Sequence, residues 1–174
     1  MLTDRAQSIL LFLVVLAAAC PVCCWGPARA DEPARVDALQ ALRVLCPGRL
    51  AMAPAFDRAA ERHRVPAGLL VAMARNESTC NPGAIGKGGE VGLMQLRPGT
   101  IAAGKVQLSR LDLPAVNVDL GARHLARCLR LCGDVPAALG VYSGRRTCAQ
   151  GRASGYARRV MGFYELAIGK ERRS

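Results

Sequence analysis

The stretch RNESTCNPGAIGKGGEVGLMQLRPGT, residues 75–100, joins the end of an apolar helical run to a glycine-rich loop. Helical spacing places Glu77 on one face with Leu70 and Met73, which follow one another at offsets of three and four residues. Burial disfavours the charged form of a carboxyl, so a glutamate that continues a core-facing stripe keeps its proton near neutral pH. A general acid needs that state. The alternative is a solvated surface glutamate, the usual environment of this residue type.

The apolar pattern along the chain predicts a mostly α-helical fold with a single core. Hydrophobic residues make up 51% of the chain and aromatic residues 4%, which favours close-packed helices over an aromatic-rich sheet. We predict helices over residues 36–45, 55–64, 66–75, 93–103, 117–131, 136–142 and 156–168. Residues 81–90 hold four glycines and a proline, which predicts a loop with room for a small β-hairpin.

The first thirty residues have the pattern of a secretory signal peptide. Arg5 precedes an eleven-residue apolar run at 9–19, which is short for a membrane span, and Ala28-Arg29-Ala30 forms a cleavage site before Asp31. We therefore expect export to the periplasm. One alternative is a lipoprotein anchored through Cys20, which small residues precede, and another is an uncleaved membrane anchor.

Cysteine usage also fits an exported protein. Cleavage before Asp31 leaves five cysteines, which are disulfide candidates in an oxidising compartment: Cys46, Cys80, Cys128, Cys132 and Cys148. Five is odd, so at least one stays free or pairs with another chain, and the sequence does not assign the pairs. His124, Cys128 and Cys132 follow at offsets of four, but eight residues of helix rise about 12 Å, too far for one zinc ion. We expect no metal and no cofactor.

The net charge predicts an acidic partner. The whole chain carries +11, and loss of Asp4, Arg5 and Arg29 with the signal peptide leaves +10. Export and the lack of aromatic residues interleaved with basic ones argue against nucleic acid. An anionic wall polymer remains, although part of the charge is explained by arginines that only solvate the surface.

A second motif follows Glu77 at a fixed distance. Gly92-Leu93-Met94-Gln95-Leu96 begins fifteen residues after Glu77. This spacing resembles the soluble lytic transglycosylase family, lysozyme-like enzymes that cleave peptidoglycan strands. The positions that match the pattern of that family are Glu77, Ser78, Pro82, Gly92, Leu93, Met94, Gln95, Leu96, Pro98 and Thr100.

Three later segments extend the resemblance to about residues 54–166. Residues 117–125 are similar to the family's Asn-x-x-x-Gly-Ala-x-Tyr-Leu helix, with His124 in place of the tyrosine. Residues 138–144 resemble its Ala-Leu-x-x-Tyr-Asn-x-Gly stretch, with Ser143 in place of the asparagine. Residues 155–160 resemble its closing Tyr-Val-x-x-Val helix.

The resemblance implies a lysozyme-like helical domain and a role for each matching residue. Glu77 would act first as the catalytic acid and then as the base. Ser78 would orient Glu77 or the acetamido group of the substrate, while Met94 and Gln95 would line the cleft. Tyr142 would hydrogen-bond near Glu77. Ser143 would lie at the substrate, where it is shorter than the asparagine it replaces.

The resemblance also implies the reaction. The enzyme would cleave the bond between N-acetylmuramic acid and N-acetylglucosamine in peptidoglycan glycan strands and leave a 1,6-anhydromuramoyl end. Its small size is similar to that of transglycosylases that serve secretion or conjugation machinery. A hydrolytic muramidase is the nearest alternative, and an inverting one needs a second carboxylate roughly 6.5–9.5 Å from the first. Glu90, Asp112 and Asp119 are the candidates. A catalytically weak peptidoglycan-binding module is a further alternative.

These expectations divide the chain into four parts. They are a signal peptide at 1–30, an N-terminal helix and linker at 31–53, a lysozyme-like transglycosylase domain at 54–168 and a basic tail at 169–174.

Overall fold

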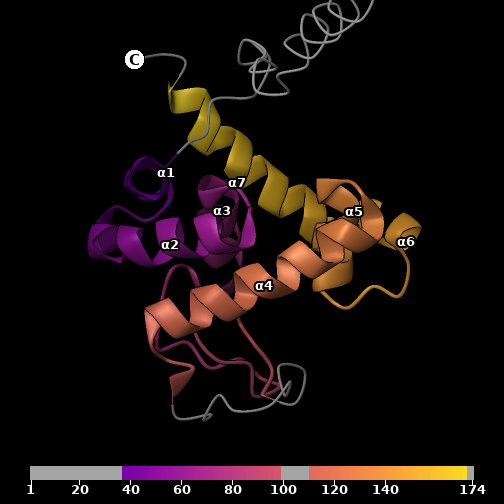
Figure 1. The fold of residues 1–174 in the computed structure, drawn as a ribbon, viewed down its shortest axis with the longest axis horizontal. Coiled ribbons are helices and arrows are strands. Elements are labelled where there is room, and N and C mark those ends of the chain that lie inside the picture. The colour runs from indigo at the N-terminus through magenta and orange to yellow at the C-terminus, as the bar shows by residue number, and fades with distance from the viewer. Residues whose placement is uncertain (1–36, 99–109, 172–174) are drawn as a thin grey trace, which may run out of the picture. The chain divides into compact units, whose positions relative to one another are not determined.

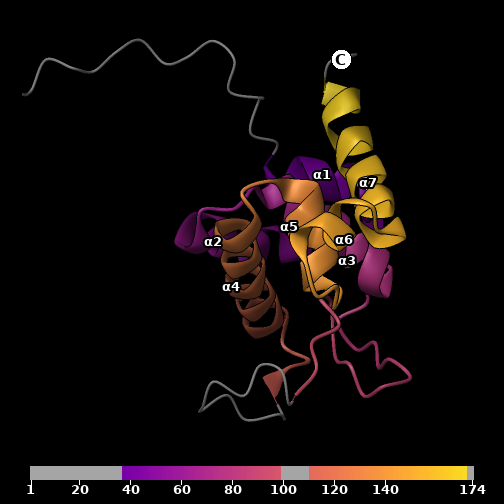
Figure 2. The ribbon, with the colours of Figure 1, turned by 90° about the vertical axis from the view of Figure 1, so that its right-hand side faces the viewer.

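The helix at the centre of the structure is apolar on every side until its last turn. The computed structural model describes residues 37–98 and 110–171. Helix α3 (Ala67–Ser78) packs against α1 (Ala38–Leu45), α2 (Ala53–His63) and α7 (Gly155–Glu171), and Figures 1 and 2 show these helices gathered around it. All residues from 69 to 74 are fully buried. An all-apolar helix of this kind belongs in a core, so α3 is a fixed support for the residues at its end.

A second group of helices lies beside this core. The long helix α4 (Pro114–Cys132) packs against α2 and α5 (Val135–Tyr142), and α5 packs against α6 (Cys148–Arg152) and α7. A short 3₁₀ helix, η1 (Pro47–Met52), connects α1 to α2. The mostly α-helical prediction is confirmed. None of the described helices is long and apolar enough to cross a membrane.

Two disulfides fix helix ends. Cys46–Cys80 joins the residue after α1 to the loop that follows α3, and Cys132–Cys148 joins the end of α4 to the start of α6. They close loops of 34 and 16 residues, and each such closure stabilises a fold by about 3 kcal/mol through the unfolded chain. Cys128 is free and buried. The first disulfide holds the end of α3, two residues from Ser78.

The segment between α3 and α4 differs from one sequence prediction. We predicted helix over 93–103, but residues 91–96 form a turn closed by antiparallel bridging of Val91 with Leu96. Gly92 and Gln95 have φ values of 79° and 45°, which a right-handed helix does not allow. Leu93 and Met94 are consecutive and both buried, which imitates a helical core pattern. Around the glycine-rich loop the described residues contain isolated bridges and no strand.

Several expectations lie outside the described residues. They are the signal peptide with its cleavage site, the lipoprotein alternative at Cys20, Thr100, the remainder of the predicted 93–103 helix and the last three residues of the basic tail. Helix α7 extends to Glu171, three residues beyond the predicted end at Ile168.

Candidate active site

Glu77 stands in the last turn of α3, where the chain leaves the core. It is half-buried, and Thr79 and Cys80 then take left-handed conformations that end the helix. The hydroxyl of Tyr156, at the start of α7, donates a 2.6 Å hydrogen bond to Glu77 Oε1. Two helices that are distant in sequence therefore position this carboxyl.

The surroundings of Glu77 raise its pKa above the ordinary value of 4.5. Burial is the largest cause, and repulsion from Glu90 acts in the same direction. The Tyr156 hydrogen bond and the positive charge of Arg159 oppose the shift but do not cancel it. The C-terminal end of a helix dipole also disfavours a negative charge. The predicted desolvation of Glu77 is confirmed, and its carboxyl is suited to donate a proton.

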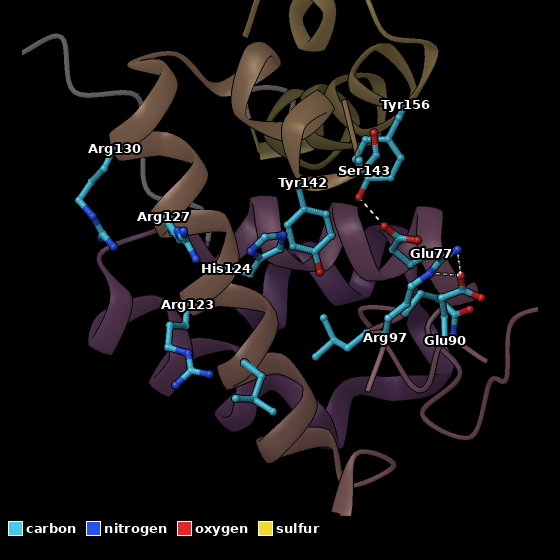
Figure 3. Close-up of a pocket in the computed structure, with 14 residues that line it drawn as sticks. Glu77, Glu90, Arg97, Arg123, His124, Arg127, Arg130, Tyr142, Ser143 and Tyr156 are labelled. Atoms are coloured by element: carbon cyan, nitrogen blue, oxygen red, sulfur yellow. Dashed lines mark hydrogen bonds and ion pairs between the residues drawn. The ribbon is translucent and has the colours of Figure 1, made fainter. Parts of the chain in front are cut away.

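Glu77 faces a cleft of about 830 Å³, a size typical of small-molecule and oligomer sites. Figure 3 shows the cleft with Glu77 at one end, Tyr142 in the middle and a row of arginines on α4 at the other end. The residues that line it come from five parts of the chain: Glu77 of α3; Glu90, Gln95, Leu96 and Arg97 of the loop; Leu120, Arg123, His124, Arg127 and Arg130 of α4; Tyr142, Ser143 and Gly144 of α5 and its following turn; and Tyr156 of α7.

Asn117 holds the Gly-Leu-Met-Gln turn against α4. Its fully buried side chain accepts a hydrogen bond from the Met94 N–H at 2.8 Å and donates to the carbonyls of Val91 and Leu111 at 2.9 and 2.7 Å. A side chain at position 92 would collide with Asn117, and the positive φ there also favours glycine. The matching Gly92 and Asn117 thus serve one structural purpose, which is to form the loop wall of the cleft.

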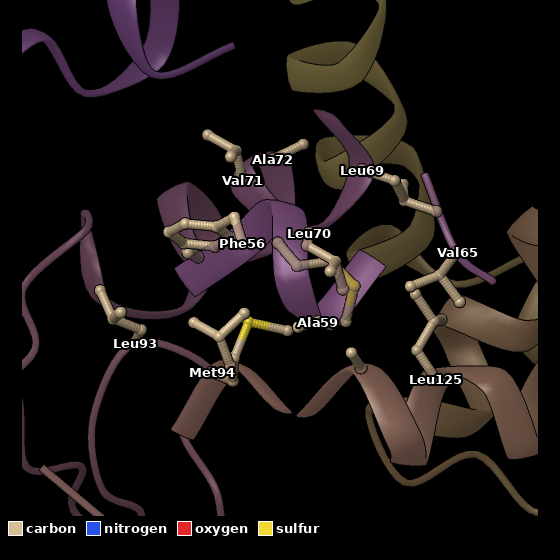
Figure 4. Packing of buried hydrophobic residues seen from close by; sticks show 14 of the residues in the cluster. Phe56, Ala59, Val65, Leu69, Leu70, Val71, Ala72, Leu93, Met94 and Leu125 are labelled. Atoms are coloured by element: carbon tan, nitrogen blue, oxygen red, sulfur yellow. The ribbon is translucent and has the colours of Figure 1, made fainter. Parts of the chain in front are cut away.

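Two residues expected at the substrate have other positions. The side chain of Met94 is fully buried and packs under Gly121 of α4, so the prediction that it lines the cleft is wrong. Figure 4 shows it in the core near Leu70 and Leu93. The Ser78 hydroxyl bonds to the carbonyls of Ala74 and Leu93 at 3.1 and 3.0 Å. Ser78 therefore ties α3 to the turn and does not contact Glu77 through its hydroxyl.

Gln95 and Ser143 do line the cleft. The Gln95 side chain donates to the carbonyls of Gly92 and Ala84 at 2.9 and 3.3 Å, which supports the loop from inside. Ser143 caps the end of α5, where its hydroxyl donates to Gly140 O at 2.8 Å. Both side chains are thus already engaged with the backbone, and substrate contacts would add to these bonds.

Three rings form the middle of the cleft. The Tyr142 hydroxyl donates to Met94 O at 3.0 Å, its ring lies 4.8 Å from that of His124, and Tyr156 stacks on its other side at 6.4 Å. Tyr142 was expected to hydrogen-bond near Glu77, and the tyrosine that bonds Glu77 itself is Tyr156. Burial, followed by the charge of Glu77, raises the pKa of both tyrosines well above 10, so each remains a donor. Tyr156 lies in the segment 155–160, whose resemblance to the closing helix of the family is the sequence feature that could have identified it.

The three candidate second carboxylates lie in different places. Glu90 lines the cleft and pairs with Arg97 at 2.6 Å. A hydrogen bond from its own backbone, then the one from Arg97, lowers the pKa of Glu90. Asp119 lies outside the cleft lining and pairs with Arg62 and His63 of α2 at 2.8 and 3.0 Å. Asp112 is exposed before α4 and does not line the cleft either. Glu90 is thus the carboxylate that shares the cleft with Glu77.

Metal ligands are not gathered in the described part of the chain. No group of three or more His, Cys, Asp or Glu side chains there has the geometry to hold an ion. Cys132, which the spacing placed in line with His124 and Cys128, is paired with Cys148.

Comparison with known proteins agrees with this geometry. The family model described as the transglycosylase SLT domain matches residues 54–158. The chain therefore belongs to the SLT transglycosylase family. A search of curated protein sequences found no significant match.

Solved structures show the same fold. An inactive mutant of the lytic transglycosylase Slt from Pseudomonas aeruginosa superposes with a TM-score of 0.60 at 20% identity, over 71% of this chain and 25% of that one. The 70 kDa soluble lytic transglycosylase SLT70 from Escherichia coli superposes with a TM-score of 0.59 at 22% identity, over 68% of this chain and 24% of that one. A complex of the 70-kDa soluble lytic transglycosylase with bulgecin A superposes with a TM-score of 0.59 at 21% identity, over 68% of this chain and 24% of that one. The chain spans about a quarter of the length of these proteins.

Proposed function

We propose that this protein is a lytic transglycosylase that cleaves the β-1,4 bond between N-acetylmuramic acid and N-acetylglucosamine in peptidoglycan. The observation that carries the proposal is the half-buried Glu77, whose pKa is raised at the end of a cleft. Membership of the SLT family supports the substrate class. The inactive Slt mutant with a similar fold has glutamine in place of one glutamate, as a reaction dependent on a single carboxyl would lead one to expect.

The first step is protonation of the leaving group. The protonated carboxyl of Glu77 donates its proton to the glycosidic oxygen, and the bond from that oxygen to C1 of the muramoyl sugar breaks. N-acetylglucosamine leaves with a free 4-hydroxyl. The positive charge that develops at C1 is stabilised by the acetamido group of the same sugar, as in substrate-assisted glycosidases.

The second step closes the ring. Glu77, now a carboxylate, removes the proton of the muramoyl 6-hydroxyl, whose oxygen bonds to C1 and forms the 1,6-anhydro product. Glu77 is protonated again, and no water is consumed. Tyr156 donates to Glu77 Oε1, so it stabilises the carboxylate between the two steps and holds its orientation. The reaction uses no cofactor.

The alternative is a hydrolytic muramidase, which Glu90 favours because it lies in the same cleft. The pKa of Glu90 is lowered and its carboxylate is paired with Arg97. This pairing makes Glu90 a weaker base for the activation of a water molecule. A weak peptidoglycan-binding module is the third possibility, and the raised pKa of Glu77 argues against it, because binding alone does not require a desolvated acid.

The proposed cellular setting rests on sequence signals alone. We propose that the protein is exported to the periplasm through residues 1–30, with acylation at Cys20 as the alternative, and that it opens local gaps in peptidoglycan for a secretion or conjugation system. Processing of the N-terminus, read by mass spectrometry of the exported protein, separates cleavage before Asp31 from lipidation.

The test is a digest of purified peptidoglycan by the mature protein, by Glu77→Gln and by the control Glu90→Gln. Glu77→Gln is expected to lose at least about a hundredfold in rate, the usual contribution of general acid–base catalysis, and Glu90→Gln about tenfold or less. Mass spectrometry should find anhydromuramoyl ends. Reducing ends, together with a large loss in Glu90→Gln, would instead establish the muramidase. Retained binding without cleavage by the wild type would leave the binding module.

A further inference from the structure

Three arginines form one wall of the cleft. Arg123, Arg127 and Arg130 project from α4 at offsets of four and three residues, so they share a face of the helix. The rise of the helix separates them by about 6 and 4.5 Å along its axis. Figure 3 shows them in a row along α4, with Tyr142 between this row and Glu77.

These guanidinium groups lack acidic partners within the part of the chain that the structure describes. The ion pairs there use Arg62, His63, Arg97 and Arg152. The three α4 arginines are exposed, and like charges at these spacings destabilise a helix. An arrangement that is unfavourable for the free protein becomes favourable when an anionic ligand lies along it.

The cleft is electrically polar from end to end. Glu77 and Glu90 are at one end and the arginine row is at the other. His124, which lies between them, tends to stay neutral because burial, followed by the charge of Arg127, lowers its pKa. A ligand with a neutral sugar at one end and negative charge at the other is bound best with its charged end at the arginine row, because these guanidinium groups have no acidic partner among the described residues, whereas Arg97 at the opposite end is already paired with Glu90.

We propose that Arg123, Arg127 and Arg130 form a subsite for the carboxylates of the peptide stem that a muramoyl residue carries. The proposal rests on the proposed function, because it places the glycan at Glu77. The row spans about 10 Å, which is the length of about three residues of an extended peptide. Arginine binds carboxylates through two parallel hydrogen bonds. The subsite would select strands that keep their stems and set the position of the glycosidic bond at Glu77.

The test measures binding in the Glu77→Gln background, so that no ligand is cleaved. Three glycan oligomers of equal length are compared: one with intact peptide stems, one with the stem carboxylates converted to amides, and one without stems. The subsite variant is Arg123→Gln/Arg127→Gln/Arg130→Gln. The control is Arg43→Gln/Arg49→Gln/Arg58→Gln, which removes the same charge from exposed positions outside the cleft.

The subsite variant is expected to bind the intact oligomer about tenfold more weakly, the combined effect of three exposed ion pairs of ordinary strength. It should bind the amidated and stem-free oligomers as the parent does. The control triple variant should show less than half of that loss. Equal losses with all three oligomers, or equal losses in the two triple variants, would show only general attraction to anions and overturn the subsite.

Binding and cleavage are separate readouts, so the two proposals can fail separately. If the wild type cleaves nothing while intact stems bind through the three arginines, the enzymatic proposal fails and the subsite stands. If the wild type cleaves intact and stem-free strands equally and the arginines change neither binding constant, the subsite is overturned and the enzyme stands. No binding of any oligomer overturns the subsite.

Discussion

Two carboxyl groups share the cleft, and their surroundings shift their pKa values in opposite directions. Glu77 ends a helix buried in the core, and its burial raises its pKa. Glu90 lies on a glycine-rich loop, where its own backbone, Arg97 and the Gly88 N–H bind the charged form and lower its pKa. The same side chain is thus an acid at one place and a fixed negative charge at the other.

The fold divides these roles between the end of a buried helix and a glycine-rich loop. The apolar helix α3 and the helices packed against it exclude much of the water around Glu77, because they fill the space beside its last turn. A loop of glycines leaves its backbone N–H groups free to bind a carboxylate. Substitutions at Asn117, at Tyr156 and at the two glutamates test this contrast.

The largest effect is expected from Asn117→Ala, which removes the support of the loop. Loss of the side chain leaves the Met94 N–H and the Leu111 carbonyl without their hydrogen-bond partner, while the Val91 carbonyl keeps only its bond from the Leu96 N–H, so the free energy of unfolding should fall by about 3 kcal/mol. Urea unfolding measures this. The control Asn81→Ala removes an exposed bond to Gly83 N and should cost less than about 1 kcal/mol. Equal losses would show that the Val91–Leu96 pairing alone supports the loop.

An intermediate effect is expected from Tyr156→Phe, which alters the surroundings of Glu77 alone. Loss of the hydrogen bond to Glu77 should lower kcat/KM about tenfold, the usual worth of one bond to a charged group. Since that bond lowers the pKa of Glu77, its removal should move the alkaline limb of the pH–rate profile to higher pH. The control Tyr164→Phe, farther along α7, should leave the limb in place. An unmoved or acid-shifted limb in Tyr156→Phe would contradict this role.

The smallest effect concerns stability as a function of pH, and its sign differs between the two glutamates. Glu77 has a raised pKa, so its stabilising contribution is complete below the unfolded value and is lost as pH rises through the folded one. Glu77→Gln should therefore melt above the wild type at pH 8, with the difference vanishing near pH 4. Glu90 has a lowered pKa, so its contribution is present above the unfolded value and is lost as pH falls through the folded one.

Glu90→Gln should accordingly melt below the wild type at neutral pH, and its difference should vanish in acid. Calorimetric Tm values of the three proteins between pH 4 and 8 measure both differences. A difference of the same sign for both variants at pH 8 would show that the two carboxyls do not have opposite environments.

The helices could be predicted from the sequence because their signals are local. The apolar spacing from Leu69 to Met73 and the proline before it predict α3 without knowledge of the rest of the chain. The turn at 91–96 could not be predicted in this way. Its buried Leu93 and Met94 are held by Asn117, more than twenty residues away, and apolar residues in succession do not show whether a helix or a turn buries them.

The residues of the candidate site were likewise predictable only in part. Glu77 and Gln95 were predicted to face the cleft from spacing and family resemblance, and both line it. Met94 matched the same motifs, yet it lies in the core, and Tyr142, which does line the cleft, donates its hydroxyl to the Met94 carbonyl. A motif records which residues a fold needs, but it does not distinguish support of the cleft wall from contact with the substrate.

The helical fold and a glutamate placed to be desolvated could be predicted from the sequence alone, because each depends on spacing along one helix. The disulfide pairs, the Tyr156 hydroxyl on Glu77 and the placement of the two glutamates and the α4 arginines in one cleft became known only from the tertiary structure. These features join residues from different helices. Their distances and burial exist only after the core has brought those helices together.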